Sequence, residues 1–300
     1  MDYTEVAVLN VGAGSCTAVW HAGSARITMV DTNDGGDQRS YEDVPSQRPL
    51  TDPISWVREN FGGGGAVFRF ILSHPDADHM AGIRRILTGE LSVSNFWDIP
   101  HTRHRKEGDC RSEAAWHDWL FYDAMRRGLA VDGVSWPKVI SPMRGSALDF
   151  WRHDGIEVLS PTPELVAAAD QVDTYNNASY VLRFSHAGRS VLLASDIEEP
   201  AWEDMIDAGI ELRANVLIAS HHGRKSGFSA EAMDLIRPEV VIVSTAKLKP
   251  EHDGISQYKR YCEHVLSTRV DGDIRVRMLD DGALQILDQD RVVLASFVEA

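Results

Sequence analysis

Ser73-His74-Pro75-Asp76-Ala77-Asp78-His79-Met80-Ala81-Gly82 is the stretch from which the organisation of the chain can be worked out. It places two imidazoles and two carboxylates within six residues, 74–79. The apolar run 67–72 before it is rich in residues that favour β-structure and predicts a buried strand. Residues 82–87 after it have the apolar spacing of a helix. The stretch therefore predicts a strand-to-helix turn that carries groups of metal-binding type.

A bound cation explains this pattern better than a polar loop does. Asp76 and Asp78 would repel each other if they lay close together unpaired, and a cation with nitrogen and oxygen ligands removes the repulsion. The alternative is a solvated loop with an accidental His-x-Asp-x-Asp-His pattern. Turns favour Asp but seldom alternate it with His, so the sequence favours a metal site.

The bulk composition indicates a soluble globular enzyme. The 300 residues, 43% of them hydrophobic, are enough for one large domain or two small ones. The 30 basic and 45 acidic residues give a net charge of −15, so a long nucleic-acid duplex would have to be bound by local basic patches. Cys16, Cys110 and Cys262 lack CxxC spacing, and buried or inactive thiols are expected.

We expect a cytoplasmic protein that does not insert into a membrane. The first residues lack a basic segment followed by an apolar one, and no segment approaches 18 uninterrupted apolar residues.

Apolar periodicity and turn residues predict strands in both halves of the chain and helices around them. The expected strands are 5–11, 16–20, 26–30, 67–72, 155–159, 179–184, 190–194, 216–219, 240–244, 283–287 and 292–297. The expected helices are 54–61, 82–87, 112–127, 200–208, 230–236 and 256–266. A polar loop is expected at 34–52 and a flexible connection at 62–65. This order suggests two sheets with helices outside.

Residues 95–144 differ in composition from the rest, with four tryptophans and three histidines. We interpret the segment as a helical, Trp-rich insertion or lid within a single domain that spans residues 1–300. Its aromatic side chains are expected to pack rather than to bind a ligand.

Three further predicted strands end in side chains that can bind a metal. Residues 26–30 lead to Asp31, residues 191–195 lead to Asp196, and residues 216–220 lead to His221 and His222. Taken singly, an Asp after a strand is usually a turn residue or a helix cap. Ligands at the ends of strands converge on one edge of a sheet, so the ordered set is a stronger signal than its parts.

The order of these pieces resembles the metallo-β-lactamase superfamily and, within it, the hydrolase domain of ComEC-type DNA-uptake proteins and their soluble stand-alone relatives. The resemblance covers most of the chain except 95–144 and the loop 34–52. It implies an α/β (α+β) fold, a four-layer αββα sandwich with two divalent metal ions at the sheet edge. The matching pieces are 10–16, 30–32, 73–82, 176–182, 192–196 and 220–226, with a looser match that ends at His252.

The resemblance also implies roles for individual residues. His74 and Asp76 would bind the first ion, and Asp78, His79 and His221 (rather than His222) would bind the second. Asp196 would bridge the ions, and Asp31 would support the cluster from behind. The third-motif histidine of the superfamily is replaced by Asn176 or Asn177, and Ser195 stands where a glycine usually precedes the bridging Asp.

These departures affect the choice of metal and the chemistry. Asp76 and an Asn carbonyl make the first site richer in oxygen, which favours Mn²⁺ or Mg²⁺ over a tightly held Zn²⁺, although Zn²⁺ stays open. Two ions about 3.5–4 Å apart can generate a bridging hydroxide and stabilise both oxygens of an in-line displacement. No Ser or Cys nucleophile is then needed. The candidate catalytic residues are Asp78, His222, His252 and Lys225.

For His222, His252 and Lys225 the sequence leaves a catalytic and a non-catalytic role open. His222 or His252 could protonate the leaving oxygen, and Lys225 with Arg224 could face a phosphate. Each could instead be a supporting or solvated residue.

The leading hypothesis is a metal-dependent phosphodiesterase or nuclease that acts on DNA, RNA or a nucleotide-derived substrate. The runs 103–106, 126–127 and 224–225 could form a local basic groove for it. One alternative is hydrolysis of a neutral acyl bond in a lactone, thioester or β-lactam, and another is a scaffold without turnover. Stand-alone relatives of this type often resemble effectors of antiviral defence systems, which implies a regulatory protein partner.

Overall fold

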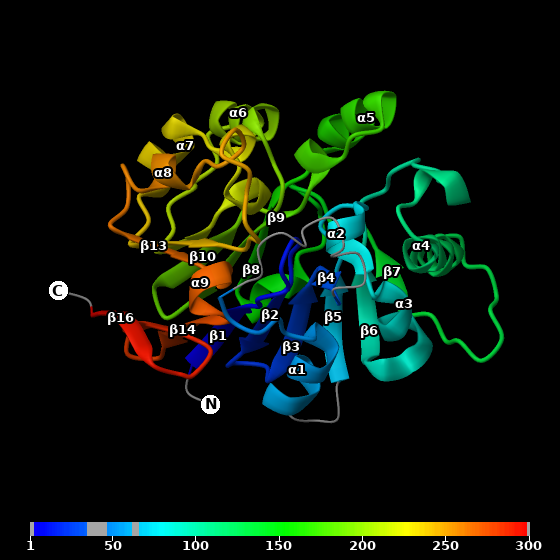
Figure 1. Ribbon diagram of the computed structural model, residues 1–300, viewed down its shortest axis with the longest axis horizontal. Coiled ribbons are helices and arrows are strands. Elements are labelled where there is room, and N and C mark those ends of the chain that lie inside the picture. The colour runs from blue at the N-terminus through cyan, green and yellow to red at the C-terminus, as the bar shows by residue number, and fades with distance from the viewer. Residues whose placement is uncertain (1–2, 35–46, 62–65, 299–300) are drawn as a thin grey trace.

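The computed structural model describes residues 3–34, 47–61 and 66–298 and contains two β-sheets (Figure 1). The first sheet has the strand order β16-β15-β14-β1-β2-β3-β5-β6-β7. The second has the order β13-β12-β11-β10-β9-β8. The strands of the first sheet are β1 Tyr3–Val8, β2 Thr17–His21, β3 Arg26–Val30, β5 Ala66–Ile71, β6 Ser92–Trp97, β7 Lys138–Ile140, β14 Ile274–Leu279, β15 Leu284–Leu287 and β16 Val293–Phe297. Those of the second are β8 Ile156–Ser160, β9 Val181–His186, β10 Arg189–Leu193, β11 Val216–Ile218, β12 Val240–Val243 and β13 His264–Ser267.

The two sheets pack face to face because their strands alternate between two apolar faces. In β10, Val191 and Leu193 belong to the core between the sheets, whereas Leu192 points to the opposite face. In β1, Val6 and Val8 join the same central core, and Ala7 faces the other way. Each sheet therefore has an inner and an outer apolar face, and both outer faces need a cover.

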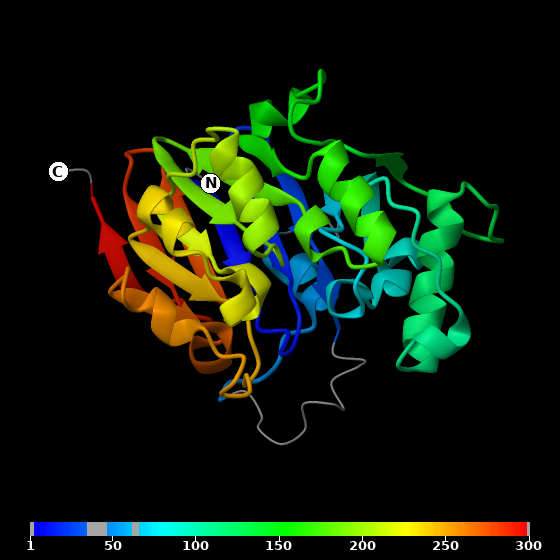
Figure 2. The ribbon, with the colours of Figure 1, turned by 90° about the horizontal axis from the view of Figure 1, so that it is seen from above.

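Helices cover the two outer faces. Apolar side chains on the outer face of the six-stranded sheet pack against three helices. These are α6 (Glu199–Asp207), α7 (Ala230–Ile236) and α8 (Ile255–Tyr258). Figure 2 looks onto these helices, with the strands behind them. On the nine-stranded sheet, the cover consists of α1 (Pro53–Asn60), α3 (Ile83–Arg85) and α4 (Glu113–Arg126). The result is a four-layer αββα sandwich, as the sequence predicts.

Several boundaries differ from the prediction. The expected helix 256–266 is wrong, because α8 ends at Tyr258 and residues 264–267 form β13, which pairs with β12. Strand β14 and helix α5 (Pro163–Val172) were not predicted. Of the expected loop 34–52, residues 35–46 lie outside the described part of the chain, as do residues 62–65.

The Trp-rich segment 95–144 begins within the first sheet and contains its last strand, β7. Its first residues belong to β6, and β7 pairs with β6 in parallel. Helix α4 lies between these two strands in the sequence and packs on the outer face. Trp97 and Trp119 are buried, as expected for aromatic residues that pack. That the segment is an insertion or lid stays a prediction.

Parallel strands place their carboxyl ends on one side of the sandwich. β3 and β5 are parallel neighbours in the first sheet, and β10, β11 and β12 are parallel neighbours in the second. The loops that follow these strands therefore meet at a common edge. Separately, no helix within residues 3–34, 47–61 and 66–298 is both long and apolar enough to span a bilayer.

Candidate metal centre

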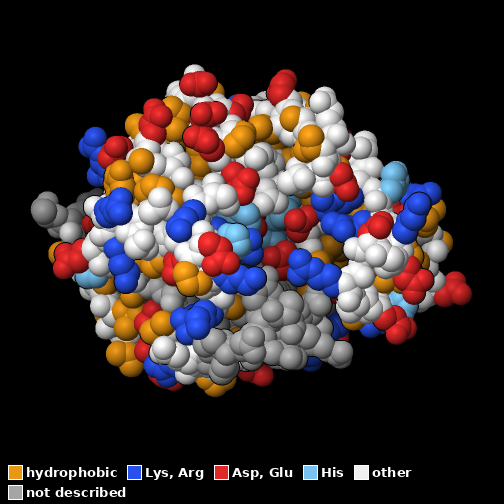
Figure 3. All heavy atoms as spheres, turned by 45° about the horizontal axis from the view of Figure 1, so that its top comes forward, with side chains coloured by type: hydrophobic (Ala, Val, Ile, Leu, Met, Phe, Trp, Pro, Cys, Tyr) orange, Lys and Arg blue, Asp and Glu red, His pale blue; other side chains and the backbone are white. Residues whose placement is uncertain are grey.

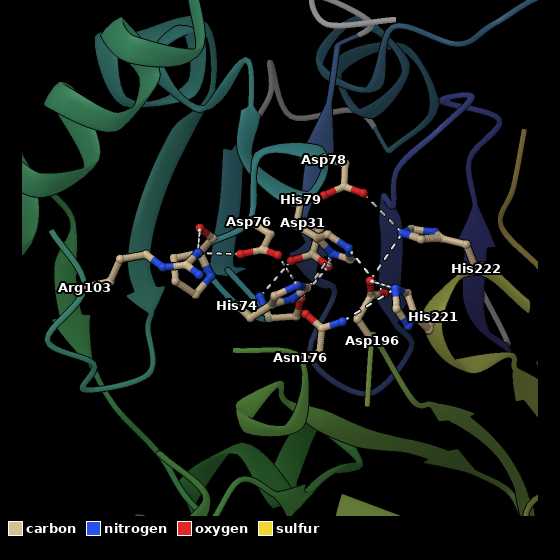
Figure 4. A network of polar contacts seen from close by, with 12 residues as sticks. Asp31, His74, Asp76, Asp78, His79, Arg103, Asn176, Asp196, His221 and His222 are labelled. Atoms are coloured by element: carbon tan, nitrogen blue, oxygen red, sulfur yellow. Dashed lines mark hydrogen bonds and ion pairs between the residues drawn. The ribbon is translucent and has the colours of Figure 1, made fainter. Parts of the chain in front are cut away.

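Four loops bring histidine and carboxylate side chains together at this edge (Figure 4). His74 follows β5, and His79 lies in the short helix α2 (Ala77–Met80). Asp31 follows β3, Asp196 follows β10, and His222 follows β11. These side chains form two groups, His74/His79/Asp196 and Asp78/His79/His222. Within each group, one possible ligand atom from each residue lies within 4.8 Å of the others.

Asp31 fixes the orientation of the loop and of the His79 ring. Its carboxylate accepts hydrogen bonds from the backbone N–H of Ser73 at 2.7 Å and from the Ser73 hydroxyl at 2.8 Å. It also accepts the Nδ1–H of His79 at 2.8 Å. Because Nδ1 carries the proton, the lone pair of His79 is on Nε2, which faces the cluster.

The other two rings are held in the same way. Nδ1 of His222 donates to the backbone carbonyl of Ser244 at 3.0 Å. Nδ1 of His74 lies 3.1 Å from the hydroxyl oxygen of Ser73. Because Ser73 donates its hydroxyl hydrogen to Asp31, this oxygen accepts the Nδ1–H of His74. In the described part of the chain, the Nε2 atoms of His74, His79 and His222 are buried and have no hydrogen-bond partner. Three buried lone pairs thus point into one cluster without protein donors.

The spacing of these atoms fits a metal ion. Nε2 of His79 lies 3.3 Å from Oδ1 of Asp196, and Nε2 of His222 lies 3.5 Å from Oδ2 of Asp196 and 3.6 Å from Oδ2 of Asp78. These separations are longer than good hydrogen bonds. Two ligand atoms that each lie about 2.1 Å from a common ion stand roughly 3–3.5 Å apart in tetrahedral or octahedral coordination. The residues therefore suit divalent cations with mixed nitrogen and oxygen ligands.

The electrostatics favour positive charge in the cluster. Burial alone would lower the pKa of His79, but Asp196 and Asp31 raise it well above its ordinary value. Burial opposes the ionised form of Asp196, but His222 and His79 hold its pKa well below the usual range. Buried carboxylates kept ionised by their neighbours attract a cation.

The structure corrects the choice between the two adjacent histidines. His222, not His221, lies with Asp78 and His79. The two residues have positive φ angles of 48° and 54°, and their Nδ1 atoms have different partners. Nδ1 of His221 lies 2.9 Å from Oε1 of Glu198, and its Nε2 lies 3.8 Å from Asp196. His222 thus lies in the group of ligand type with Asp78 and His79, and His221 borders the cluster.

Asp76 is shared between the centre and Arg103. Oδ2 of Asp76 lies 3.8 Å from Nε2 of His74, on the side where the first ion is expected. Its Oδ1 accepts from the buried guanidinium of Arg103, which also donates to the carbonyl of Pro75 at 2.9 Å and to Asp173. Burial would raise the pKa of Asp76, but His74 and Arg103 lower it. Sequence reasoning noted Arg103 only as part of a basic run and missed this contact.

The departures at Asn176, Asn177 and Ser195 have different consequences. The Asn176 amide lies 3.5 Å from Nε2 of His221, beside the cluster. The Asn177 side chain instead accepts the backbone N–H of Glu198 at 2.9 Å, a structural role. Ser195 has a positive φ of 48°, the conformation that glycine adopts most easily, and its hydroxyl donates to the carbonyl of Tyr180 at 2.7 Å.

The turn at residues 10–16 packs directly behind the motif. The backbone N–H of Ser15 donates to the carbonyl of Asp78 at 3.2 Å. A Cβ at Gly14 would overlap that same carbonyl oxygen and the amide of Asn33. The turn therefore supports the metal edge, and close approach of two backbones requires glycine at position 14.

His252 and Lys225 are not brought into the cluster. Their side chains are exposed, the backbone N–H of Lys225 donates to the carbonyl of His252 at 2.9 Å, and the ammonium of Lys225 donates to the carbonyl of Pro250 at 3.2 Å. Within the described residues, neither side chain forms an ion pair or hydrogen bond with the His/Asp cluster. The contacts therefore do not support the catalytic roles expected for His252 and Lys225.

The basic groove expected from the sequence also needs correction. Arg103 is buried against Asp76, and Arg126 pairs with the buried Asp98 and donates to the carbonyl of His101 at 2.8 Å. Both are occupied inside the protein. On the face that carries the centre, histidine side chains and carboxylates lie in a hollow with Lys and Arg side chains on either side (Figure 3). Arg105, from the same basic run, keeps 27% of its side chain exposed.

Comparison with known proteins finds two similar sequences. The chain is 26% identical over 284 residues to "Recombination protein 2" of Haemophilus influenzae, a match that covers 92% of this chain and 29% of that protein. It is 25% identical over 282 residues to "ComE operon protein 3" of Bacillus subtilis, covering 91% of this chain and 33% of that protein. The chain thus spans no more than a third of the length of these relatives. No protein-family model matches it.

Solved structures with similar folds are more distant in sequence. The metallo-β-lactamase fold protein YhfI from Bacillus subtilis has a TM-score of 0.49 at 12% identity, over 92% of this chain and 100% of that chain. A diphosphatase from the PhnP family has a TM-score of 0.43 at 10% identity, over 92% and 98%. Zn²⁺-bound PqqB from Methylobacterium extorquens has a TM-score of 0.43 at 13% identity, over 87% and 97%. The four-layer sandwich is consistent with the metallo-β-lactamase fold, and most of the chain is similar to one region of each of the two sequence relatives.

Proposed function

We propose that the protein is a metal-dependent hydrolase that cleaves phosphodiester bonds in nucleotides or single-stranded nucleic acid. The observation that carries the proposal is the set of three buried Nε2 atoms, on His74, His79 and His222, that have no hydrogen-bond partner among the described residues. They face Asp196 and Asp78, whose carboxylates complete two groups of ligand type. Such an arrangement is costly unless a cation occupies it.

Different residues of the chain would hold the two ions. His79, His222 and Asp78 would hold one ion, His74 and Asp76 would hold the other, and Asp196 would contact both. Divalent ions bound there supply Lewis acidity and lower the pKa of a bound water to near neutrality. Asp31 and the Ser244 carbonyl keep the imidazoles in the tautomer that presents Nε2.

A phosphodiester fits the surroundings better than a neutral acyl bond. Nη2 of Arg105 lies 3.9 Å from Oδ1 of Asp76, so a guanidinium stands at the border of the centre. Guanidinium groups bind phosphate oxygens in a bidentate manner and stabilise charge that develops during phosphoryl transfer. Carboxylate ligands at the first ion also favour Mn²⁺. The net charge of −15 opposes long duplexes, which supports short or single-stranded substrates.

The test pairs metal content with two chromogenic substrates. Protein loaded with Mn²⁺ is assayed on bis(p-nitrophenyl) phosphate and on p-nitrophenyl acetate. The same assays are run on Asp78→Asn and on the control Asp280→Asn, which changes an exposed carboxylate that pairs with His186. We expect two bound ions and metal-dependent cleavage of the phosphodiester, reduced at least a hundredfold in Asp78→Asn only.

Other outcomes would redirect the assignment. Cleavage of the acetate ester alone would support the acyl-hydrolase alternative. Bound metal without cleavage of either compound would contradict the proposal as stated. Absence of bound metal in both the wild type and the control would favour a scaffold. Single- and double-stranded DNA of equal length then test the substrate preference, with faster cleavage of the single strand expected.

A further inference from the structure

A pocket of about 230 Å³ opens beside the candidate metal centre. It lies between the motif loop and the N-terminal half of α4. Asp76 and Asp78 line one side, so the pocket shares two residues with the centre. Buried Met80 and Trp119 contribute apolar lining, and Arg105 contributes charge. A ligand group held in this pocket would therefore lie next to the bond that is cleaved.

Three of the arginines that line the pocket are available to a ligand. Among the described residues, Arg84 and Arg111 are exposed and form no ion pair, and Arg105 has only the 3.9 Å contact with Asp76. The Arg105 guanidinium also lies 5.8 Å from the centre of the Trp119 ring. Arg85 is different, because Asp52 and Glu90, both at 2.9 Å, already hold it.

The other acidic residues of the pocket are already engaged. Asp118 accepts the backbone N–H groups of Gly82 at 2.8 Å and Arg84 at 2.9 Å. Asp109 accepts the backbone N–H of Lys106 at 2.8 Å. Asp34 lies 3.4 Å from Arg85. These contacts leave the guanidiniums of Arg84 and Arg111 without a carboxylate partner among the described residues, so both can bind an anion.

We propose that this pocket binds a terminal phosphate of a single-stranded nucleotide chain, one position away from the phosphodiester at the metal centre. Guanidinium groups over an apolar lining are suited to phosphate, and the volume accommodates part of a nucleotide but not a duplex. The inference rests on the proposed function and narrows its substrate to chains that carry an end phosphate. Arg84 and Arg111, which line the pocket and are not used at the metal centre, are then specificity-determining residues.

The experiment compares two dinucleotides that differ only in the terminal phosphate. Wild type, the double variant Arg84→Gln/Arg111→Gln and the control Arg152→Gln are assayed on 5′-phosphorylated and 5′-hydroxyl dinucleotides. Arg152 is exposed and pairs with Asp149, away from this pocket. We expect the wild type and the control to prefer the phosphorylated compound by at least tenfold in kcat/KM. This is the effect of one charge-assisted hydrogen-bonded contact. The double variant should lose that preference.

A binding measurement separates this inference from the proposed function. Titration calorimetry with adenosine 5′-monophosphate is carried out on the same three proteins, after equal melting temperatures show that they are folded. At least tenfold weaker binding by the double variant supports the pocket even if no substrate is cleaved. Equal binding by all three proteins, or a preference that survives in the double variant, overturns the inference. Cleavage of bis(p-nitrophenyl) phosphate with no phosphate preference would leave the proposed function standing without the pocket.

Discussion

Oδ2 of Asp31 lies 2.8 Å from Nδ1 of His79, and both side chains are buried. The same carboxylate holds the backbone and hydroxyl of Ser73. One side chain from the end of β3 thus fixes both the tautomer of His79 and the path of the loop that carries it. Its role can be tested without removing a metal ligand.

Asp31→Asn should reduce metal affinity by about 10- to 100-fold, the usual effect of losing such a supporting carboxylate. The amide keeps the size but offers only one acceptor oxygen for three donors. Mn²⁺ titration monitored by calorimetry measures the change, and Asp280→Asn serves as the exposed carboxylate control. Unchanged affinity in Asp31→Asn would contradict the role assigned to Asp31.

Gly14→Ala should weaken metal binding through the backbone of Asp78. The added Cβ would overlap the Asp78 carbonyl oxygen, so the turn and the motif loop must move apart. Gly23→Ala is the matched control, because a Cβ there has no heavy atom within 4 Å in the described structure. We expect a loss of about 1–3 kcal/mol in unfolding free energy for Gly14→Ala, together with weaker Mn²⁺ binding. Equal behaviour of the two variants would show that the turn can adjust freely.

Arg103→Met should destabilise the protein and make Mn²⁺ more stabilising than it is in the wild type. The change removes the hydrogen-bonded partner of the Asp76 carboxylate and leaves only the 3.9 Å contact with Arg105, at a cost of about 3 kcal/mol. A cation at the first site would then offset the unpaired charge. Melting temperatures with and without Mn²⁺ test this expectation, and Arg127→Met, which removes an exposed pair with Asp123, is the control. A smaller Mn²⁺-dependent shift in Arg103→Met than in the wild type would contradict it.

Local patterns were sufficient to predict the layers and the edge where the polar groups meet. Residues 191–194 and 216–219 are continuous apolar runs followed by polar residues, and that pattern is visible in any single sequence. Strand β13 was missed because the residues before it have helical spacing, and only pairing with β12 makes them extended. Such tertiary preferences cannot be deduced from one segment.

Within the site, the pattern predicted which residues cluster but not how each is oriented. His221 and His222 are adjacent and chemically identical, and the positive φ angles that direct them apart depend on the surrounding loop. Arg103 is 27 residues from Asp76, and a run of basic residues gives no sign that one of them is buried. Contacts of this kind depend on the three-dimensional arrangement of the loops.

Because of Asp98, the free energy of unfolding should fall as the pH rises from about 4 to 6. Burial raises the pKa of Asp98 to about 6 from an ordinary value of 3.8, against the lowering effect of Arg126. Between these two values the folded carboxyl keeps its proton and the unfolded one loses it, so stability falls with rising pH. A shift of about two units corresponds to at most about 3 kcal/mol.

Chemical denaturation of the wild type and Asp98→Asn at pH 4, 5, 6 and 7 measures this effect. The unfolding free energy of the wild type should fall relative to that of the variant up to pH 6 and then stay level. Asp149→Asn, an exposed carboxylate that pairs with Arg152, should follow the wild type. Parallel curves for the wild type and Asp98→Asn would mean that Asp98 ionises normally in the folded protein.

His221→Asn and His222→Asn should separate the two adjacent histidines. His222 contributes a buried Nε2 that lies 3.6 Å from Asp78 and 3.5 Å from Asp196, so its loss should lower the affinity of the second ion by at least a hundredfold. His221 is held by Glu198 and borders the cluster, so His221→Asn should retain both ions with affinities within about threefold of the wild type. Metal content after dialysis, followed by Mn²⁺ titration, gives both numbers. The reverse pattern, with the ion lost in His221→Asn and kept in His222→Asn, would restore the assignment expected from the sequence and require the loop 220–223 to turn when metal binds.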